Sequence, residues 1–422
     1  MSNPLLVVPA YVRSKLEEIA WEHSFVGGTY EICLEPGSKV GDGFIGQMVR
    51  ATIRGDRLVD GDRLLRDQVM RLICKVPLED PIQREKFNSM LLFEREVLVY
   101  NEVLPEFERL QLAKGLWRGD DVGFWNFPRC YWASFDAEQG ESMLIMEDLV
   151  ERGLELKDKY VLVDYDHVKV LMVALGKMNA CSFALREQKP EVFEKIKRLD
   201  DLLSVIMMTE QTKPLSRRNC DLAASIFNEE DMKEKRWKNN FSSLKDCIWE
   251  KTQKLMASQK VEPYGAFNHG DCWTNNVMFG YDKATNSVQE IVLLDWQMAR
   301  YGSPIMDLLS FLYLCGEIDL RREHFNDLLQ TFYNAFATTF RALGGQPEKS
   351  FPFEAIHAQM KLFGAQVVTM STFAFPILSK LPDEFFRKNA DRTKEEFQPQ
   401  FCRYQQLMKD ICRDSEHFED LE

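Results

Sequence analysis

Three side chains with oxygen atoms suited to phosphate chemistry lie within one short stretch of the chain. Asp271 stands in the polar segment His269-Gly270-Asp271-Cys272, and Asn276 follows five residues later. The apolar run Ile291-Val292-Leu293-Leu294 then ends in Asp295. A tight loop and a short buried strand would bring two carboxylates and a carboxamide to one point, where they could hold Mg²⁺ and leave one acid to orient a hydroxyl. The pattern indicates phosphoryl transfer, in which catalysis is mostly positioning and charge neutralisation.

A lysine lies inside an apolar strand far upstream of this stretch. Lys75 is surrounded by Leu72-Ile73-Cys74 and Val76, where an unpaired ammonium would be costly. Residues 87–104 have helical spacing with Glu96 near the middle, and Glu94 or Glu102 could equally supply the partner. A strand lysine paired with a helix glutamate grips the α- and β-phosphates in kinases. The alternatives are an edge-strand lysine that reaches solvent and a solvated helix face.

A glycine-rich turn precedes that strand. Gly41, Gly43 and Gly46 form the pattern G-x-G-x-x-G, and the segment after it alternates like a strand. A strand–turn–strand arrangement is therefore expected, because a dinucleotide-binding fold would need a helix there. The turn is either a phosphate loop, whose backbone N–H groups approach phosphate oxygens, or a plain hairpin turn.

The stretch that begins at His269 resembles the phosphotransferase signature H-x-D-x-x-x-x-N, followed by a metal-binding aspartate. With the segments FEREVLVYNEVLP, LIMEDL and LLDWQMARYGSPIMDLLSFL, the chain from about residue 35 to about 415 is similar to the insect ecdysteroid kinase-like family, a branch of the aminoglycoside and choline kinase group. The resemblance implies a two-lobed, protein-kinase-like α+β fold with ATP and Mg²⁺ as cofactors. It also implies that Asp271 is the catalytic acid and that Asn276 and Asp295 bind the metal.

The resemblance also suggests how the chain divides. The segment Glu147-Asp148-Leu149 is similar to the family's hinge, whose backbone groups would bond the adenine edge; the alternative is an ordinary exit from a strand. Residues 1–148 are expected to form a mixed β-sheet lobe with five strands that binds the nucleotide. Residues 149–422 are expected to form a mainly helical lobe for catalysis and substrate. Two departures from the family are noted: glycines at 43 and 46, where it more often has Asn and Ser, and Asn179, where it usually has His.

His269 could be catalytic or structural. We group it with Asp271 and Lys75 as a catalytic candidate, although Asp271 is the better-placed base and His269 is then expected to fix the loop by bonding backbone. Asp307 opens an apolar helix and is expected to cap it or to anchor the loop. Only residues 296–303 separate Asp295 from Pro304, which leaves no room for the activation segment of a protein kinase. The acceptor is therefore expected to be a small molecule.

Aromatic residues stand beside the chemical groups and bear on the acceptor. Trp273, Trp296 and Tyr301 either line an apolar pocket or pack the loops. The first possibility favours a hydroxylated, steroid-like alcohol as substrate, consistent with an ecdysteroid kinase. The alternatives are a choline- or sugar-type small-molecule kinase and a catalytically silent ligand-binding protein with the same fold.

Composition limits the partners and the location. The net charge of −13 argues against nucleic acid, which demands a basic surface. The ten cysteines form no C-x-x-C pair and are expected to be free thiols. The first residues lack the basic start of a signal peptide, and no apolar run reaches the ~18 residues of a membrane span. A cytoplasmic enzyme with a small-molecule alcohol substrate is expected, and the sequence leaves its oligomeric state open.

Overall fold

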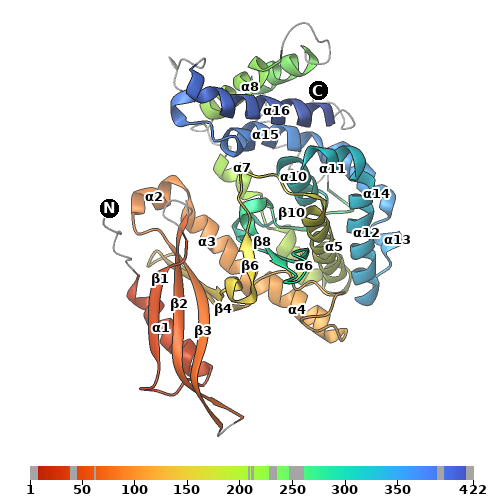
Figure 1. Ribbon diagram of the computed structural model, residues 1–422. Coiled ribbons are helices and arrows are strands. Elements are labelled where there is room, and N and C mark those ends of the chain that lie inside the picture. The colour runs from red at the N-terminus through yellow and green to blue at the C-terminus, as the bar shows by residue number, and fades with distance from the viewer. Residues whose placement is uncertain are drawn as a thin grey trace. The chain divides into compact units, whose positions relative to one another are not determined.

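The computed structural model describes residues 8–38, 45–60, 63–207, 210, 213–227, 235–246, 261–386 and 394–414 (Figure 1). The chain packs as two compact units, which are Met1–Pro105 with Phe127–Glu155 and Glu106–Asn126 with Leu156–Glu422. The expected lobes, 1–148 and 149–422, are each continuous along the chain, whereas the packing units are not. Segment Glu106–Asn126 belongs to the second unit because the buried Phe107 packs edge-on against Phe267.

The first unit is built on the expected five-stranded sheet. Its strands are β1 (Glu31–Pro36), β2 (Gly46–Val59), β3 (Arg63–Pro77), β4 (Cys130–Asp136) and β5 (Glu141–Glu147), in the order β1-β2-β3-β5-β4. Every pair is antiparallel, so the expectation of a mixed sheet is wrong. The β2–β3 and β4–β5 neighbours are joined by hairpins, and a hairpin makes its two strands antiparallel.

Strands β2 and β3 are longer than their sequence suggests. Residues 55–67 have the charges of a loop, yet pairing continues to Val59↔Arg63, with an irregularity between Gly55 and Arg57. An extra residue of this kind bends and twists a strand without ending it.

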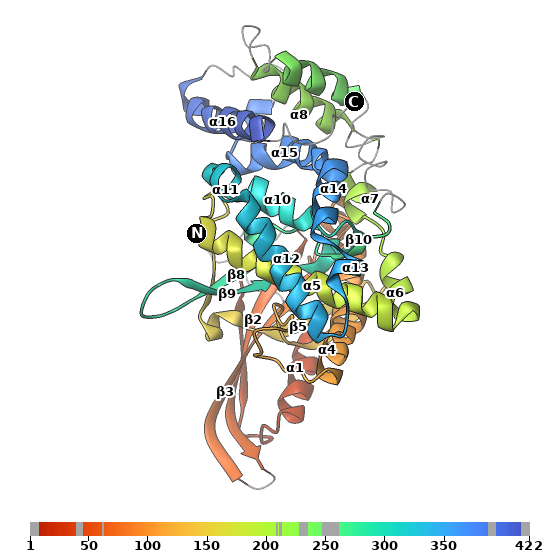
Figure 2. The same ribbon diagram turned by 90° about the vertical axis from the view of Figure 1, so that its right-hand side faces the viewer.

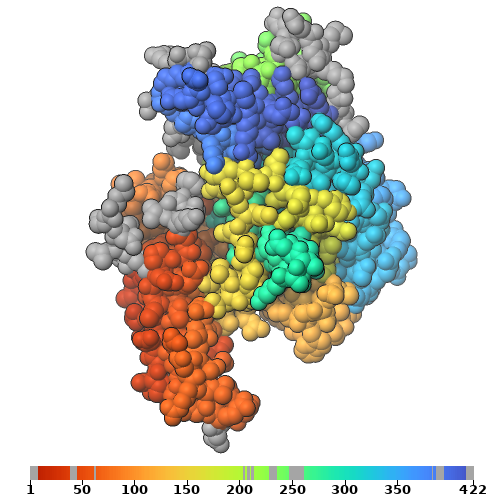
Figure 3. All heavy atoms as spheres, in the orientation of Figure 1, coloured from red at the N-terminus to blue at the C-terminus, as the bar shows by residue number. Residues whose placement is uncertain are grey.

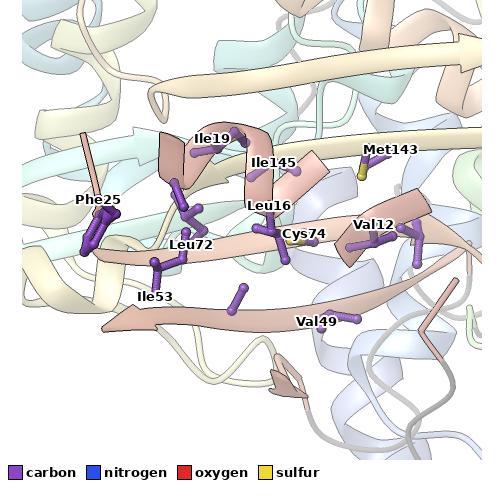
Figure 4. Packing of buried hydrophobic residues seen from close by; sticks show 13 residues of the cluster. Val12, Leu16, Ile19, Phe25, Val49, Ile53, Leu72, Cys74, Met143 and Ile145 are labelled. Carbon is purple, nitrogen blue, oxygen red and sulfur yellow. The ribbon is translucent and has the colours of Figure 1, made fainter. Parts of the chain in front are cut away.

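Helix α1 (Ala10–Glu22) covers one face of this sheet (Figure 4). Its apolar stripe, Val12, Leu16 and Ile19, is buried against residues of β2, β3 and β5 such as Val49, Leu72 and Ile145. Spacing of three and four residues places the stripe on one helix face, and the alternation of the strands supplies the opposing face.

The helix expected over 87–104 is interrupted. Following α2 (Pro81–Lys86), helix α3 (Ser89–Leu98) runs into a π-helical turn, η1 (Val99–Val103), and then into α4 (Leu104–Ala113). Wider turns of this kind are uncommon and have no simple sequence signature.

The second unit is mainly helical, as expected. Its central pair, α5 (Tyr165–Gln188) and α12 (Phe325–Ala342), packs side by side (Figure 2). Helix α15 (Ala365–Leu378) packs against both α8 (Lys213–Ser225) and α16 (Gln398–Asp414). Residues 235–246 are also helical. Further helices are α6 (Pro190–Lys197), α7 (Leu202–Met207), α10 (Met306–Leu314), α11 (Ile318–Glu323), α13 (Pro347–Ser350) and α14 (Phe353–Phe363).

Short strands complete this unit. They are β7 (Ala266–Asn268), β8 (Val277–Tyr281), β9 (Val288–Leu293) and β10 (Arg300–Gly302), while β6 (Leu154–Leu156) lies at the change of unit. Strand β10 pairs with β7, and β8 forms a hairpin with β9. This hairpin lies at the surface beside the chain that leads into α5 (Figure 3).

One described helix, α5, is long and apolar enough to cross a membrane, or two spans could be counted if the bent pair α13–α14 and α15 is included. However, 78% of the apolar window of α5 is buried inside the protein, as in the core helix of a folded unit. Asn179, the departure noted above, is one of its buried residues, and its Oδ1 accepts no hydrogen bond from any residue that the structure describes.

Candidate active site

The two chemical segments of the second unit are brought together by a strand pairing. Strand β8 begins directly after Asn276, and its first residue, Val277, pairs with Leu293 at the end of β9. The N–H of Leu294 donates to the carbonyl oxygen of Asn276 at 2.8 Å. Asp295 therefore follows β9 at the same end of the hairpin at which Asn276 precedes β8.

The loop between β7 and β8 is anchored by Asp307, at the start of α10. Its buried carboxylate accepts hydrogen bonds from the N–H groups of His269, at 2.6 Å, and Gly270, at 3.0 Å. The expected anchoring role of Asp307 is thus confirmed. Two charge-assisted bonds to one carboxylate fix consecutive peptide groups and leave the loop little freedom.

His269 is fully buried, and its ring binds backbone. Nε2 lies 2.7 Å from the carbonyl oxygen of Leu294, and Nδ1 lies 3.4 Å from the N–H of Asp271. An imidazole that donates from Nε2 and accepts at Nδ1 satisfies both contacts. The ring therefore joins the loop to the end of β9. Of the two roles considered for His269, these contacts match the structural one.

Gly270 is required by the path of this loop. Its φ of +83° is one that side chains rarely adopt, and a Cβ atom there would lie 1.9 Å from the carbonyl oxygen of Met298. The loop passes directly over the residues after Asp295, and only glycine permits that approach.

Asn276 holds the Asp271 carboxylate in place. Its Nδ2 donates to Oδ2 of Asp271 at 2.7 Å and to the main-chain oxygen of Asp271 at 2.9 Å. Because the amide nitrogen is committed to these two oxygens, the amide oxygen of Asn276 remains as a candidate metal donor.

Asp295 adopts a left-handed backbone conformation, with φ of 63° and ψ of 66°, just before the short helix η5 (Trp296–Met298). A non-glycine residue in this region is uncommon, and such conformations cluster at functional sites. Burial, and after it the Asp295 carboxylate, raises the pKa of Asp271 to about 6. The two acids therefore lie close enough to repel each other.

These residues fit a magnesium ion. Two repelling carboxylates and an amide oxygen form a hard-oxygen donor set that a divalent cation would neutralise, and Mg²⁺ takes few protein ligands beside phosphates and water. Among the described residues there is no cluster of three His, Cys, Asp or Glu side chains that could hold a metal. Asn276 and Asp295 remain the candidate ligands predicted from the sequence, and phosphates and water would have to complete the coordination.

Two of the three aromatic residues expected near the acceptor are part of the core. Trp296 is fully buried, stacks on Phe267 and contacts the His269 ring. Tyr301 is also buried, and its hydroxyl bonds Glu262 at 2.7 Å. The alternative interpretation, packing of the loops, is the correct one for both.

In the first unit, Lys75 and Glu96 form a buried ion pair. Nζ of Lys75, on the central strand β3, lies 2.6 Å from Oε2 of Glu96 on α3, and the residues are 8% and 1% exposed. Glu94 and Glu102 are exposed, so Glu96 is the partner among the three candidates. The pair satisfies a lysine that the apolar strand would otherwise leave desolvated.

The glycine turn is described only in part, since Gly41 and Gly43 lie outside the described residues. Gly46 is the first residue of β2, where a Cβ atom would lie 2.8 Å from the carbonyl oxygen of Val76 and 2.9 Å from the Phe93 ring. This close packing explains a glycine at 46 without any ligand.

The expected hinge turns directly into a short helix, η2 (Leu149–Arg152). The N–H groups of Glu147 and Asp148 donate to the carbonyl oxygens of Arg129 and Arg71. The Asp148 side chain accepts from Arg50 Nε at 2.6 Å and caps η2. Within the described residues the N–H of Leu149 has no such acceptor.

Sequence reasoning missed two supports of the site. Asn126 binds β9 on both sides of Val292: its carbonyl oxygen accepts from the N–H of Leu293 and its Nδ2 donates to the oxygen of Ile291, both at 2.8 Å. No local pattern marks this residue. Arg300 is a buried cation in the apolar run Met298-Ala299-Arg300, the same signal that singled out Lys75.

The structure therefore contains two groups of candidate residues, each within one unit. Asp271, Asn276 and Asp295 meet in the second unit, and Lys75 meets Glu96 in the first. Joint action of the two groups on one nucleotide is part of the proposal below.

Comparison with known proteins finds the ecdysteroid kinase-like family over residues 40–345. The Caenorhabditis elegans protein "Uncharacterized oxidoreductase dhs-27" is 24% identical over 317 residues, which cover 69% of this chain and 34% of that protein. The chain thus spans about a third of the length of that curated relative. Among solved structures, the GDP complex of wild-type aminoglycoside 2'-phosphotransferase-IIIa aligns over 94% of this chain and 98% of its own, with a TM-score of 0.40 and 12% identity.

Proposed function

Because the chain belongs to the ecdysteroid kinase-like family, we propose that it transfers the γ-phosphoryl group of ATP to a hydroxyl of an ecdysteroid or a similar apolar alcohol. At a coarser level, membership of this family supports a small-molecule kinase-like function. The observation that carries the proposal is the placement of Asp271, which Asn276 holds beside Asp295 on an anchored loop.

In this proposal Asp271 orients the acceptor hydroxyl and receives its proton. A positioned base of this kind contributes on the order of 10²–10⁴-fold to the rate. The bond from Asn276 fixes the orientation of the carboxylate, so the acid is preorganised before the alcohol arrives. His269 positions the same loop through Leu294.

Asn276 and Asp295 would hold Mg²⁺, which when bound neutralises charge on the phosphates. The fixed backbone of Asp295 presents its carboxylate at the end of β9. In the first unit, Lys75 would contact the α- and β-phosphates, and Glu96 would keep the ammonium in place. The N–H of Leu149 is the proposed donor to the adenine edge.

The class of acceptor is proposed from the family. Since Trp296 and Tyr301 are buried in the core, an aromatic pocket beside the site would have to be formed by other residues, with only Trp273 of the original three partly exposed. A choline- or sugar-type acceptor differs in carrying charge or many hydroxyls, so a substrate panel separates these classes directly.

The test is turnover by the purified protein. It is incubated with Mg²⁺, ATP and a panel of ecdysteroids, other sterols, choline and sugars, and each alcohol is examined for a gain of about 80 Da, the mass of an added phosphoryl group. The proposal predicts this gain for one or more apolar alcohols, with equimolar ADP. If only choline or a sugar is phosphorylated, the proposed apolar acceptor is wrong and the protein is a choline- or sugar-type kinase. Tight ligand binding without transfer would favour a catalytically silent binding protein.

A further inference from the structure

A buried arginine, Arg300, lies on the strand that pairs with β7, directly before the anchored loop. Strand β10 pairs with β7 so that Arg300 is opposite Asn268, the residue immediately before His269. The Arg300 residue is only 5% exposed. A guanidinium cannot be neutralised by losing its proton, so its charge remains in the interior and must be compensated there.

The compensation comes from a distant segment of the same unit. Nη1 of Arg300 lies 2.9 Å from Oδ1 of Asp201, and the two side chains are 6% and 11% exposed. Asp201 lies between α6 and α7. A second contact joins the same segments: the N–H of Tyr301, the residue after Arg300, donates to the carbonyl oxygen of Leu199 at 3.2 Å. Two contacts thus fasten residues 199–201 to β10.

The hydrogen bonding of the Arg300–Asp201 pair is incomplete, so stability alone does not explain the pair. Nε of Arg300 is buried and has no hydrogen-bond partner in the part of the chain that the structure describes. Removing two charges from water costs several kcal/mol per ion, and a buried ion pair is often no more stabilising than apolar side chains of the same volume. A role in orienting other charged groups gives a reason for keeping it.

Those groups are the carboxylates of the candidate site. Burial opposes the charge of Arg300, yet Asp201, Asp307 and Asp271 outweigh it and raise the pKa of the guanidinium. Arg300 also pairs with Asn268, the residue before His269, whose N–H binds Asp307. Strand pairing and charge together link Arg300 to the acid that anchors the loop and to the acid proposed to act on the acceptor.

We propose that the Arg300–Asp201 pair is a positioning element for phosphoryl transfer, which keeps the loop anchored at Asp307 and Asp271 in its working place. This inference rests on the proposed function and adds to it two residues that touch neither nucleotide nor acceptor. It further implies that the segment 199–201, before α7, is coupled to the catalytic loop.

The chain supplies a matched control. Nε of Arg321, on α11, lies 2.8 Å from Oδ2 of Asp414 at the end of α16, and these side chains are 4% and 9% exposed. It is also a buried arginine–aspartate pair of the second unit, but among the described residues its hydrogen-bond partners lie on α10, α11 and α16 rather than on the loop. A general loss of stability should follow from damage to either pair, whereas loss of positioning should follow only from damage to the first.

The experiment compares Asp201→Asn with Asp414→Asn, and Arg300→Lys tests partial rescue because it keeps the charge but not the fork geometry. Three quantities are measured: thermal unfolding, hydrolysis of Mg·ATP with water as the acceptor, and hydrogen exchange of the amides of His269 and Gly270. Asp201→Asn is expected to lower kcat at least tenfold with KM for ATP within twofold, and to speed exchange of both amides at least tenfold. Asp414→Asn should change unfolding temperature only, and Arg300→Lys should retain more kcat than Arg300→Met.

Equal kcat and equal amide exchange in Asp201→Asn and Asp414→Asn would overturn the inference. If the parent protein hydrolyses no ATP, the proposed function is in question, and amide exchange alone decides the positioning role. Faster exchange of the His269 and Gly270 amides in Asp201→Asn alone would then uphold the coupling, and unchanged exchange would overturn it. Arg300→Met that fails to fold is replaced by Arg300→Gln in the comparison.

Discussion

Replacing Asp271 by asparagine should abolish phosphoryl transfer while making the metal-free protein more stable. An amide has nearly the shape of a carboxylate, so the Oδ1 of the new residue can still accept the hydrogen bond from Asn276. What disappears is the basic oxygen that would receive the acceptor proton and the negative charge that repels Asp295. Loss of the base predicts a fall in kcat of about 10²–10⁴-fold.

The gain in stability follows from the pKa of Asp271. Folding raises that pKa from 3.8 to about 6. Well below pH 3.8 the acid is protonated in both states. Between pH 3.8 and about 6 the unfolded chain loses this proton while the folded protein keeps it, so stability present at low pH is lost as the pH rises through this window. A shift of about two units corresponds to ~3 kcal/mol at most, and exchanging a charged for a neutral hydrogen bond returns ~1 kcal/mol. The net prediction at pH 7.5 is a gain of ~1–2 kcal/mol in the free energy of unfolding.

The assay joins two measurements on the same protein. Unfolding is followed by denaturant titration without Mg²⁺ at pH 5 and pH 7.5, and ADP formation is followed with Mg²⁺ present. The variant should exceed the parent in stability at pH 7.5 by more than at pH 5, with nucleotide affinity retained. Asp319→Asn, an exposed acid of α11, is the control and should change neither quantity. Turnover by Asp271→Asn equal to that of the parent would remove Asp271 from the mechanism, and a loss of stability at pH 7.5 would refute the electrostatic reasoning.

Three further outcomes are expected. Glu96→Gln should raise KM for ATP about tenfold, or ~1.4 kcal/mol, in steady-state kinetics, whereas Glu94→Gln, exposed on the same helix, should not. Gly46→Ala should lower the free energy of unfolding by ~1–3 kcal/mol in a denaturant titration, with little change in KM, because the new Cβ atom overlaps neighbouring atoms. Its control, Gly27→Ala, places the Cβ atom in open space and should leave the free energy of unfolding unchanged. Mg²⁺ should bind more tightly at pH 7.5 than at pH 5 in calorimetry and release protons near pH 6, because a cation lowers the pKa of Asp271; pH-independent binding would place the metal elsewhere.

Local patterns were enough to predict the elements that position the site. The apolar stripe of α1 and the alternation of β1 to β3 are typical of a helix packed on a sheet, and both elements are present. A lysine in an apolar strand requires a partner, which pointed to a glutamate of the next helix, although only the fold selected Glu96 from three candidates. Spacing also placed Asp271 and Asn276 in one loop, and the anchoring role of Asp307 was expected from its position at the start of α10.

What the sequence could not give depends on contacts between distant residues. Whether an aromatic residue lines a pocket or fills the core depends on what covers it, and Trp296 and Tyr301 fill the core. The partner of Arg300 stands 99 residues away, so no local pattern connects it to Asp201. The π-helical turn η1 and the packing of Glu106–Asn126 with the second unit are likewise decided by tertiary contacts.

The central claim is that Lys75, Asn276 and Asp295 serve one molecule of ATP. The most direct measurement is a crystal structure of the protein with Mg²⁺ and a non-hydrolysable ATP analogue. The proposed function predicts one bound nucleotide, with Nζ of Lys75 at its α- and β-phosphates. It also predicts a magnesium ion bound by Oδ1 of Asn276 and the carboxylate of Asp295. A nucleotide that contacts only one of these two groups, or a metal bound without Asp295, would contradict it.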